Sequence, residues 1–114
     1  MNLNARSIEI GNLLTDLPAP GSDETFTTLL ERPGVRIERI VSHGHTTPED
    51  EPYEQAGDEW VLLVEGAARL WLDGQGEVAL AAGDHLLIPA GLRHRVTWTL
   101  PDAPTVWLAV HVAA

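Results

Sequence analysis

A histidine placed just after a sharply punctuated turn is the first feature of this sequence that could do chemistry. In the stretch GDHLLIPAGLRHRV, residues 83–96, the apolar run Leu86–Ile88 is typical of a buried strand. Pro89 and Gly91 end that run, and His94 follows three residues after the glycine. An imidazole can bind a metal or transfer a proton near neutral pH. The pattern therefore predicts a functional site at His94.

A carboxylate upstream has a spacing that completes a known pattern. Glu59 is followed by six residues and then by Gly66, which gives E-x6-G, and residues 83–94 read G-x5-P-x-G-x2-H. These two motifs, in this order, resemble the two sequence motifs of the cupin superfamily over about residues 35–112. The family's second motif ends in an asparagine, where this chain has Trp98.

The first motif departs from the family just before Glu59. In cupins two histidines in an H-x-H pattern precede this glutamate, and here Tyr53 and Gln55 occupy those positions. The chain does contain an H-x-H, at His43 and His45, but it lies ten residues too early. Two alignments therefore stay open. The favoured one builds the site around Tyr53 and Gln55, and the other brings His43 and His45 in across an extended loop.

The resemblance implies a metal centre inside the barrel. In the favoured alignment its ligands are Gln55, Glu59 and His94. Imidazole and carboxylate donors suit a divalent transition metal, here Fe, Mn, Ni or Zn. A neutral amide is a weak ligand, so this set should hold a metal less tightly than three histidines would.

Further side chains are expected around this centre. Glu59 and Tyr53 are the expected catalytic groups, because both can move protons. Arg93 or Arg95 would pair with a carboxylate of the ligand, and Trp98 would form an apolar wall. The face of His111 cannot be assigned, because both faces of residues 105–112 are apolar. The side chains expected to contact the ligand are His43, Tyr53, Arg95, Trp98 and His111.

Turn signals divide the chain after residue 24 into eight strand-like segments, none with a sustained helical period. They are predicted at residues 25–31, 35–43, 59–65, 67–72, 78–81, 85–88, 93–99 and 105–112. Short strands at this spacing predict a sandwich, barrel or jelly roll. With the motifs, the expected fold is all-β, a cupin-type double-stranded β-helix or jelly-roll barrel. We expect one cupin domain over residues 1–114, with an N-terminal arm at 1–23 and a barrel core at 24–114.

The amino-acid composition limits the kinds of partner that the protein is expected to bind. The net charge of −10 argues against nucleic acid and against anionic membranes, because both are polyanions. The chain has no cysteine, which excludes disulfides and thiolate chemistry. Residues 1–14 contain no apolar stretch like the core of a signal peptide. The lack of cysteine and the lack of such a stretch together favour a cytoplasmic protein. Residues 59–65 are apolar on both faces, so the outer face needs cover, and we expect a homodimer.

The expected function is a small metal-binding cupin with a pocket for a small polar molecule, such as a carboxylate or a sugar acid. Fold does not give the reaction, and a metal-dependent isomerase, lyase or dioxygenase all stay open. One alternative is a non-catalytic small-molecule-binding or sensor cupin without metal, favoured by the loss of the two family histidines. Another is an iron-dependent dioxygenase, which needs two histidines and a carboxylate and therefore needs His43 or His45 in the site.

Overall fold

The computed structural model describes residues 7–114, and the eight predicted strands are confirmed there to within two residues at each end. The strands are β1 (Thr25–Arg32), β2 (Val35–Ser42), β3 (Asp58–Glu65), β4 (Ala67–Leu72), β5 (Gly76–Ala81), β6 (His85–Ile88), β7 (His94–Thr99) and β8 (Thr105–Val112). Within the described residues the fold is all-β.

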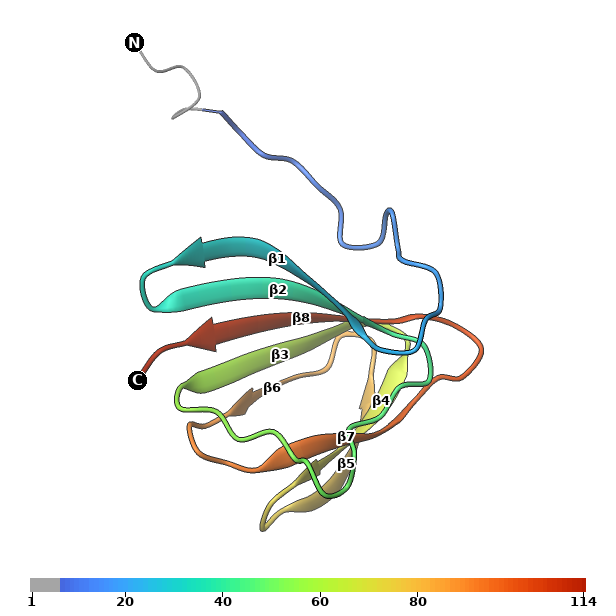
Figure 1. The fold of residues 1–114 in the computed structure, drawn as a ribbon, viewed down its shortest axis with the longest axis vertical. Helices are drawn as coiled ribbons and strands as arrows, with labels where there is room; N and C mark the ends of the chain where they lie inside the picture. The colour runs from blue at the N-terminus through green and yellow to red at the C-terminus, as the bar shows by residue number, and fades with distance from the viewer. Residues whose placement is uncertain (1–6) are drawn as a thin grey trace.

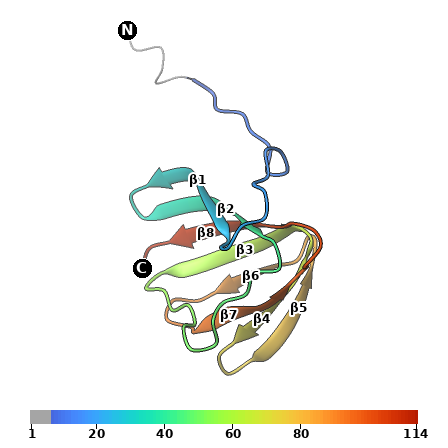
Figure 2. The same ribbon diagram turned by 45° about the vertical axis from the view of Figure 1, so that its right-hand side comes forward.

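The strands form two antiparallel sheets that face each other (Figure 1). The larger sheet has the order β1-β2-β8-β3-β6, and the smaller has the order β5-β4-β7. The turned view in Figure 2 shows the two sheets meeting on one side and opening on the other, with the loop between β2 and β3 crossing the open side. The jelly-roll expectation is confirmed by this arrangement.

Alternation along the strands builds the core. In β3 the side chains of Val61 and Leu63 are buried, whereas Trp60 and Leu62 between them are only partly buried. Burying an aliphatic side chain of this size contributes about 1.5–3 kcal/mol. The buried cluster between the sheets consists of Val61, Leu63, Ala68, Leu70, Leu72, Ile88, Val96 and Trp107.

The glycine of the E-x6-G motif has a structural reason. Gly66 joins β3 of the larger sheet to β4 of the smaller one, with φ at +97°. A Cβ at this position would lie 2.8 Å from Thr105 Cα and 2.6 Å from its Oγ1. Both the left-handed backbone and the close approach therefore favour glycine.

The N-terminal segment lies above β1 in Figure 1 and extends away from the barrel. The Arg39 guanidinium donates hydrogen bonds to the carbonyl oxygens of Leu13, Thr15 and Asp16, which fastens this segment to the outer face of β2. No helix in residues 7–114 is long and apolar enough to cross a membrane.

Candidate functional site

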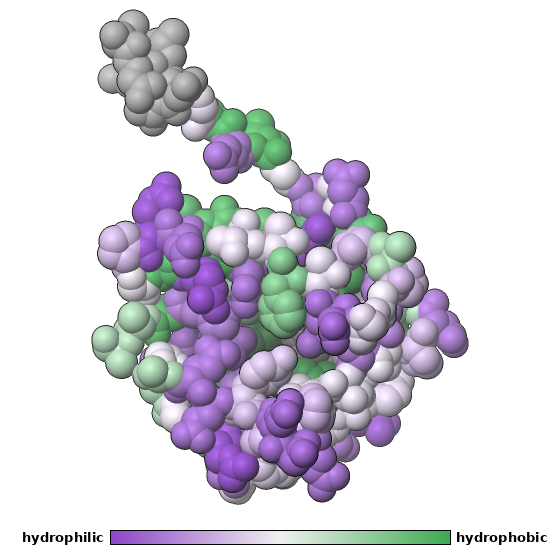
Figure 3. Space-filling view, in the orientation of Figure 1, coloured by the Kyte–Doolittle hydropathy of each residue, from purple (hydrophilic) through white to green (hydrophobic). Residues whose placement is uncertain are grey.

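A cavity of about 240 Å³ lies between the two sheets. The space-filling view shows this face of the molecule hollowed near its centre, with hydrophobic atoms inside the hollow and hydrophilic residues around it (Figure 3). Its apolar lining is Phe26, Ile40, Val61, Leu70, Ile88, Val96 and Trp107. Its polar lining is Glu24, Arg36, Glu38, Tyr53, Gln55, Glu59, His94 and His111.

The turn between β6 and β7 positions His94. The amide of Ala90 donates to Asp58 Oδ1 at 2.8 Å, and the amide of Gly91 donates to the Gln55 carbonyl at 2.7 Å. Gly91 has φ at +79°, a conformation that glycine adopts without strain. The proline–glycine turn is therefore fastened to the residues that precede β3, and His94 leaves it buried to 4% exposure.

Strand register brings three charged or titratable side chains into one row. Glu59 on β3 pairs with His111 on β8, and His111 pairs with Arg36 on β2. Directly paired residues of antiparallel strands project to the same face. Because Glu59 lines the cavity, His111 and Arg36 do so as well, which settles the face of His111 that the sequence left open.

A chain of hydrogen bonds links this row to His94. His94 Nε2 lies 3.3 Å from Glu59 Oε1, and the Gln55 amide nitrogen donates to the same oxygen at 3.2 Å. The carbonyl oxygen of Gln55 lies 2.9 Å from His111 Nδ1, and His111 Nε2 lies 2.8 Å from Glu38 Oε1. Two acids and two imidazoles thus alternate across the cavity, with one amide between the pairs.

The contact between His94 and Glu59 requires a positive charge or a proton between the two atoms. His94 Nδ1 lies 2.9 Å from the Leu92 carbonyl, which can only accept, so Nδ1 carries hydrogen. If Nε2 carried none, its lone pair would face a carboxylate oxygen at 3.3 Å. Burial alone would lower the pKa of His94, but its hydrogen bonds to Glu59 and to the Leu92 carbonyl outweigh burial and raise that pKa.

Tyr53 lies against His94 at the rim of the cavity. The two residues exchange backbone hydrogen bonds of 2.7 and 2.9 Å, and their ring centroids are 5.7 Å apart. Burial raises the pKa of the Tyr53 hydroxyl, and the carboxylates of Glu24 and Glu59 raise it further. Tyr53 therefore keeps its proton at neutral pH and can donate a hydrogen bond to a bound molecule.

The three predicted metal ligands lie together, but their hydrogen bonds occupy part of the donor set. Gln55 presents its amide nitrogen to Glu59, and its carbonyl oxygen contacts His111. Only His94 Nε2 and one oxygen of Glu59 therefore face each other as ready ligand atoms. Among residues 7–114 no group of three or more His, Asp or Glu side chains is arranged to hold a metal ion. The facing atoms of His94 and Glu59 could hold one metal ion, whereas Gln55 would join them only by giving up its contact with His111.

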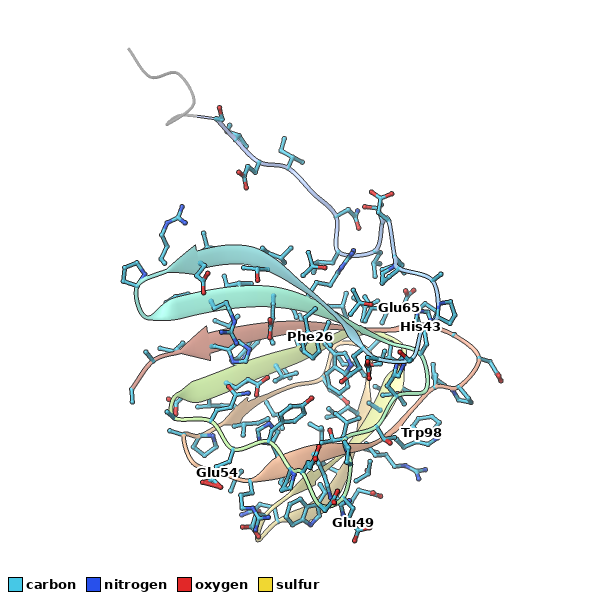
Figure 4. All side chains as sticks on the ribbon, viewed as in Figure 1. Phe26, His43, Glu49, Glu54, Glu65 and Trp98 are labelled. Atoms are coloured by element: carbon cyan, nitrogen blue, oxygen red, sulfur yellow. The ribbon has the colours of Figure 1, made fainter. Side chains whose placement is uncertain are left out.

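Three of the residues predicted to contact the ligand lie outside the cavity. His43 Nε2 contacts the Pro18 carbonyl at 3.0 Å, and in Figure 4 this side chain lies beside the N-terminal segment. The Arg95 guanidinium lies over the outer Trp71 ring, 5.3 Å from its centroid. Trp98 is partly exposed on the outer side of the smaller sheet, as Figure 4 shows.

The placement of Trp98 has a physical cause in β7. Strict alternation would put Trp98 on the same face as His94 and Val96. The register with β4 shifts here, because Leu70 pairs with Val96 while Arg69 pairs with Trp98, so β7 carries one extra residue. This bulge turns Trp98 outward and leaves Thr99 buried instead.

Three polar cavity residues were not predicted from the sequence. Glu38 is 7% exposed and holds His111, and Arg36 lies beside it with Nε 3.7 Å from Glu38 Oε2. Glu24 directly precedes β1 and accepts a hydrogen bond from Ser42. A carboxylate in the middle of a predicted strand, as at Glu38, was the available signal for this part of the site.

The comparisons with known proteins agree with the fold. The model of the cupin domain family matches residues 39–111. A structure from Ralstonia eutropha JMP134, provisionally described as a mannose-6-phosphate isomerase, is 45% identical, covers 94% of this chain and 100% of its own, and has a TM-score of 0.90. A cupin superfamily protein from Desulfitobacterium hafniense DCB-2 is 20% identical over 95% of this chain and 94% of its own, with a TM-score of 0.75.

A more distant structure is an RmlC-like cupin from Desulfovibrio desulfuricans. It is 17% identical over 93% of this chain and 97% of its own, with a TM-score of 0.75. No curated protein sequence matches the chain. The family match spans well over half of the sequence, and both of its motifs have a structural role in the barrel. This chain therefore belongs to the cupin family.

Proposed function

We propose that this cupin binds a small polar molecule in its cavity without needing a metal, with the polar end of that molecule at Glu59 and His94. The supporting observation is the 3.3 Å contact between His94 Nε2 and Glu59 Oε1, together with the hydrogen that His94 Nδ1 gives to Leu92. A proton on Nε2 satisfies this contact without any further ligand. A bound hydroxyl, carbonyl or amino group would exchange hydrogen bonds with this pair and with Tyr53.

The size and lining of the cavity limit the kinds of ligand that it can hold. A volume of about 240 Å³ lies below the range of roughly 300–1,000 Å³ of pockets for drug-sized ligands, so the ligand is small. Arg95, a predicted partner of a carboxylate, lies outside. Arg36 lines the cavity, but the Glu38 carboxylate lies beside it. A neutral or cationic head group is therefore better supported than a carboxylate.

The description of the Ralstonia eutropha structure raises the question of a sugar phosphate. Isomerisation of a sugar moves a proton between neighbouring carbons, and Glu59 as base with Tyr53 as acid would suit such a step. A phosphate carries close to two negative charges and needs several cationic or amide donors. Arg36 is the single arginine or lysine among the described lining residues. We therefore favour an uncharged polyol or carbonyl compound over its phosphate, with Tyr53 and Glu59 as the residues that would move protons.

The test uses metal-free protein and the indole signals of its four tryptophans. Trp107 lines the cavity, whereas Trp60, Trp71 and Trp98 do not, so these three serve as internal controls. We expect cyclohexanol, a small neutral probe, to shift the Trp107 Nε1–H signal in a nuclear magnetic resonance titration and to leave the other three in place. A Trp107 signal that changes only after a divalent metal is added would overturn metal-independent binding.

A divalent transition metal, Fe, Mn, Ni or Zn, is the second candidate. The observation in its favour is the 3.3 Å spacing of His94 Nε2 and Glu59 Oε1, close to the spacing of two ligands about 2.0–2.1 Å from one tetrahedral ion. When bound, such an ion would act as a Lewis acid toward an oxygen of the ligand. Gln55 would add its carbonyl oxygen only by giving up its contact with His111.

Elemental analysis by mass spectrometry decides between the two candidates. The protein is purified without a histidine tag or chelator, beside His94→Ala and Gln55→Ala. Metal-independent binding predicts substoichiometric metal in all three. About one metal per chain in the wild type, lost in His94→Ala and reduced in Gln55→Ala, would establish the metal centre instead. The His45→Ala variant is the matched control, because His45 contacts the Gly21 carbonyl outside the cavity.

We also propose that the protein is a homodimer. The support is the edge strand β1, on which the side chains of Leu29 and Leu30 are exposed beside the half-exposed Phe26. Apolar side chains on an unpaired edge strand favour pairing with another chain. Light scattering of the purified protein should give twice the monomer mass of 12.4 kDa, and a monomer at all concentrations would contradict the proposal.

A further inference from the structure

The end of the cavity that lies away from Arg36 carries a carboxylate with half of its hydrogen-bonding capacity unused. Glu24 lines the cavity, and its Oε2 accepts the hydroxyl hydrogen of Ser42. Ser42 in turn accepts the indole N–H of Trp107 at 3.2 Å, so its single hydrogen is committed to Glu24. No described residue donates a hydrogen bond to the other oxygen of Glu24, Oε1.

Register places two aromatic side chains on the same face of the larger sheet as this carboxylate. Phe26 on β1 pairs with Ile40 on β2, and Ile40 pairs with Trp107 on β8, so the three side chains share one row on the cavity face. Glu24 lies two residues before Phe26, which puts it on the same side of an extended chain. Phe26 is about half exposed, and in Figure 4 it lies on the open side of the larger sheet.

A carboxylate oxygen that shares a cavity with two aromatic side chains is a chemical environment that favours a cation. The carboxylate offers a charge-assisted hydrogen bond, and an ammonium over an aromatic ring gains further electrostatic attraction. His45 lies outside the cavity, where its Nε2 contacts the Gly21 carbonyl. The chain as a whole carries a net charge of −10, which raises the local concentration of cations.

We infer that Glu24, Phe26 and Trp107 form a second subsite of the cavity, and that this subsite takes a primary ammonium group of the ligand. This inference rests on the proposed binding function and specifies its ligand class. The ligand is a small amine whose apolar body packs on Ile40 and Trp107 and whose other end reaches Glu59 and His94. A carboxylate or phosphate at the Glu24 end would meet an unpaired carboxylate and is excluded from this subsite.

The test compares three probes that share one ring and differ only in the head group. These are cyclohexylamine, cyclohexanol and cyclohexanecarboxylate, titrated into metal-free protein while the Trp107 indole signal is followed. We expect the amine to bind at least about tenfold more tightly than the alcohol, in line with a hydrogen bond to a charged group. The carboxylate should leave the Trp107 signal unchanged.

Three variants test whether the preference for the amine over the alcohol arises from this subsite. Glu24→Gln keeps an acceptor for Ser42 but removes the charge, so it should weaken amine binding at least about tenfold and alcohol binding less than about twofold. Phe26→Leu should weaken only the amine, by a few-fold. Glu65→Gln is the matched control, because Glu65 is exposed at the end of β3, as Figure 4 shows, and does not line the cavity.

The outcomes separate this inference from the function on which it rests. An alcohol that binds as tightly as the amine, or a Glu24→Gln variant that weakens both equally, overturns the ammonium subsite and leaves the cavity as a binding site. A Trp107 signal that responds to none of the probes overturns both. If Glu24→Gln loses its native circular dichroism spectrum, Phe26→Leu still tests the subsite. An unchanged preference of Phe26→Leu for the amine over the alcohol would contradict the subsite.

Discussion

The two sheets of the barrel face the same cavity but contribute different kinds of side chain to it. The larger sheet contributes Arg36, Glu38, Glu59 and His111 at one end of the cavity, together with apolar side chains such as Ile40 and Trp107. The smaller sheet contributes the apolar side chains of Leu70 and Val96, with His94 at the start of β7 as its one titratable cavity residue. The larger sheet therefore carries most of the chemistry, and the smaller sheet supplies an apolar wall.

The division between the two sheets allows a small barrel to hold a polar site and still be stable. The titratable groups of the cavity lie in pairs, with Glu38 against His111 within the larger sheet and Glu59 against His94 across the two sheets. Buried polar groups without partners would each cost about 1–3 kcal/mol. The apolar wall opposite needs no such pairing. Substitutions on the two sheets should therefore have different consequences, for stability on one side and for binding on the other.

The largest expected effect is on the stability contributed by the apolar wall. Leu70 is 3% exposed in the core, and Leu70→Ala should lower the free energy of unfolding by about 2–5 kcal/mol. Glu59→Gln on the opposite sheet keeps the size and much of the hydrogen bonding of the side chain. It should therefore lower the free energy of unfolding by less than Leu70→Ala does. Urea unfolding of both variants measures the contrast. Equal losses would show that the two sheets do not divide the roles in this way.

A smaller loss is expected at the junction between the two sheets. Gly66→Ala places a Cβ against Thr105 at a φ of +97° and should cost about 1–3 kcal/mol for the backbone alone, plus the clash. Gly74 has φ at +79° with open space around it, so Gly74→Ala isolates the backbone contribution. The difference between the two in urea unfolding gives the cost of the contact. A Gly66→Ala variant no less stable than Gly74→Ala would argue against close packing at this junction.

The turn that positions His94 was predictable from the sequence because its residues act locally. Proline and glycine fix the backbone within a few residues, so G-x5-P-x-G-x2-H and E-x6-G indicated both the fold and two of the site residues. The opposite orientation of Asp58 and Glu59 also follows from simple alternation. Asp58 points away from the cavity and accepts the Ala90 amide, while Glu59 is buried in it.

The rest of the site was not predictable because it depends on partners far along the chain. In β2 the apolar residues Val35, Ile37 and Val41 alternate with Arg36 and Glu38. If apolar side chains always faced the interior, Val35, Ile37 and Val41 would line the cavity. Instead Arg36 and Glu38 line it, and the N-terminal segment contacts Arg39 on the outer face. Burial of Glu38 is favourable because His111 on β8 and Arg36 lie against its carboxylate. Trp98 was misplaced for a similar reason, since its bulge depends on the register with β4.

The pairing of His94 with Glu59 should give the larger sheet a pH-dependent contribution to stability. The pKa of His94 is raised in the folded protein, so this contribution is complete below its ordinary value of about 6.5. It is lost as the pH rises through the raised folded pKa. Metal-free protein should therefore lose more stability between pH 5.5 and pH 9 than His94→Gln does. Urea unfolding at both pH values measures this, and a parallel loss in wild type and variant would contradict the pairing.

The smallest effect is expected at the histidine pair that the sequence also offered as a site. His43 holds the N-terminal segment through the Pro18 carbonyl and does not line the cavity. His43→Ala should therefore cost about 0.5–1.5 kcal/mol, the usual worth of one hydrogen bond. It should leave the response of Trp107 to cyclohexanol unchanged, whereas His94→Ala should reduce that response. If His43→Ala reduced it as much, then His43 would reach the cavity in solution, and the site would extend beyond the two sheets to the segment that covers β2.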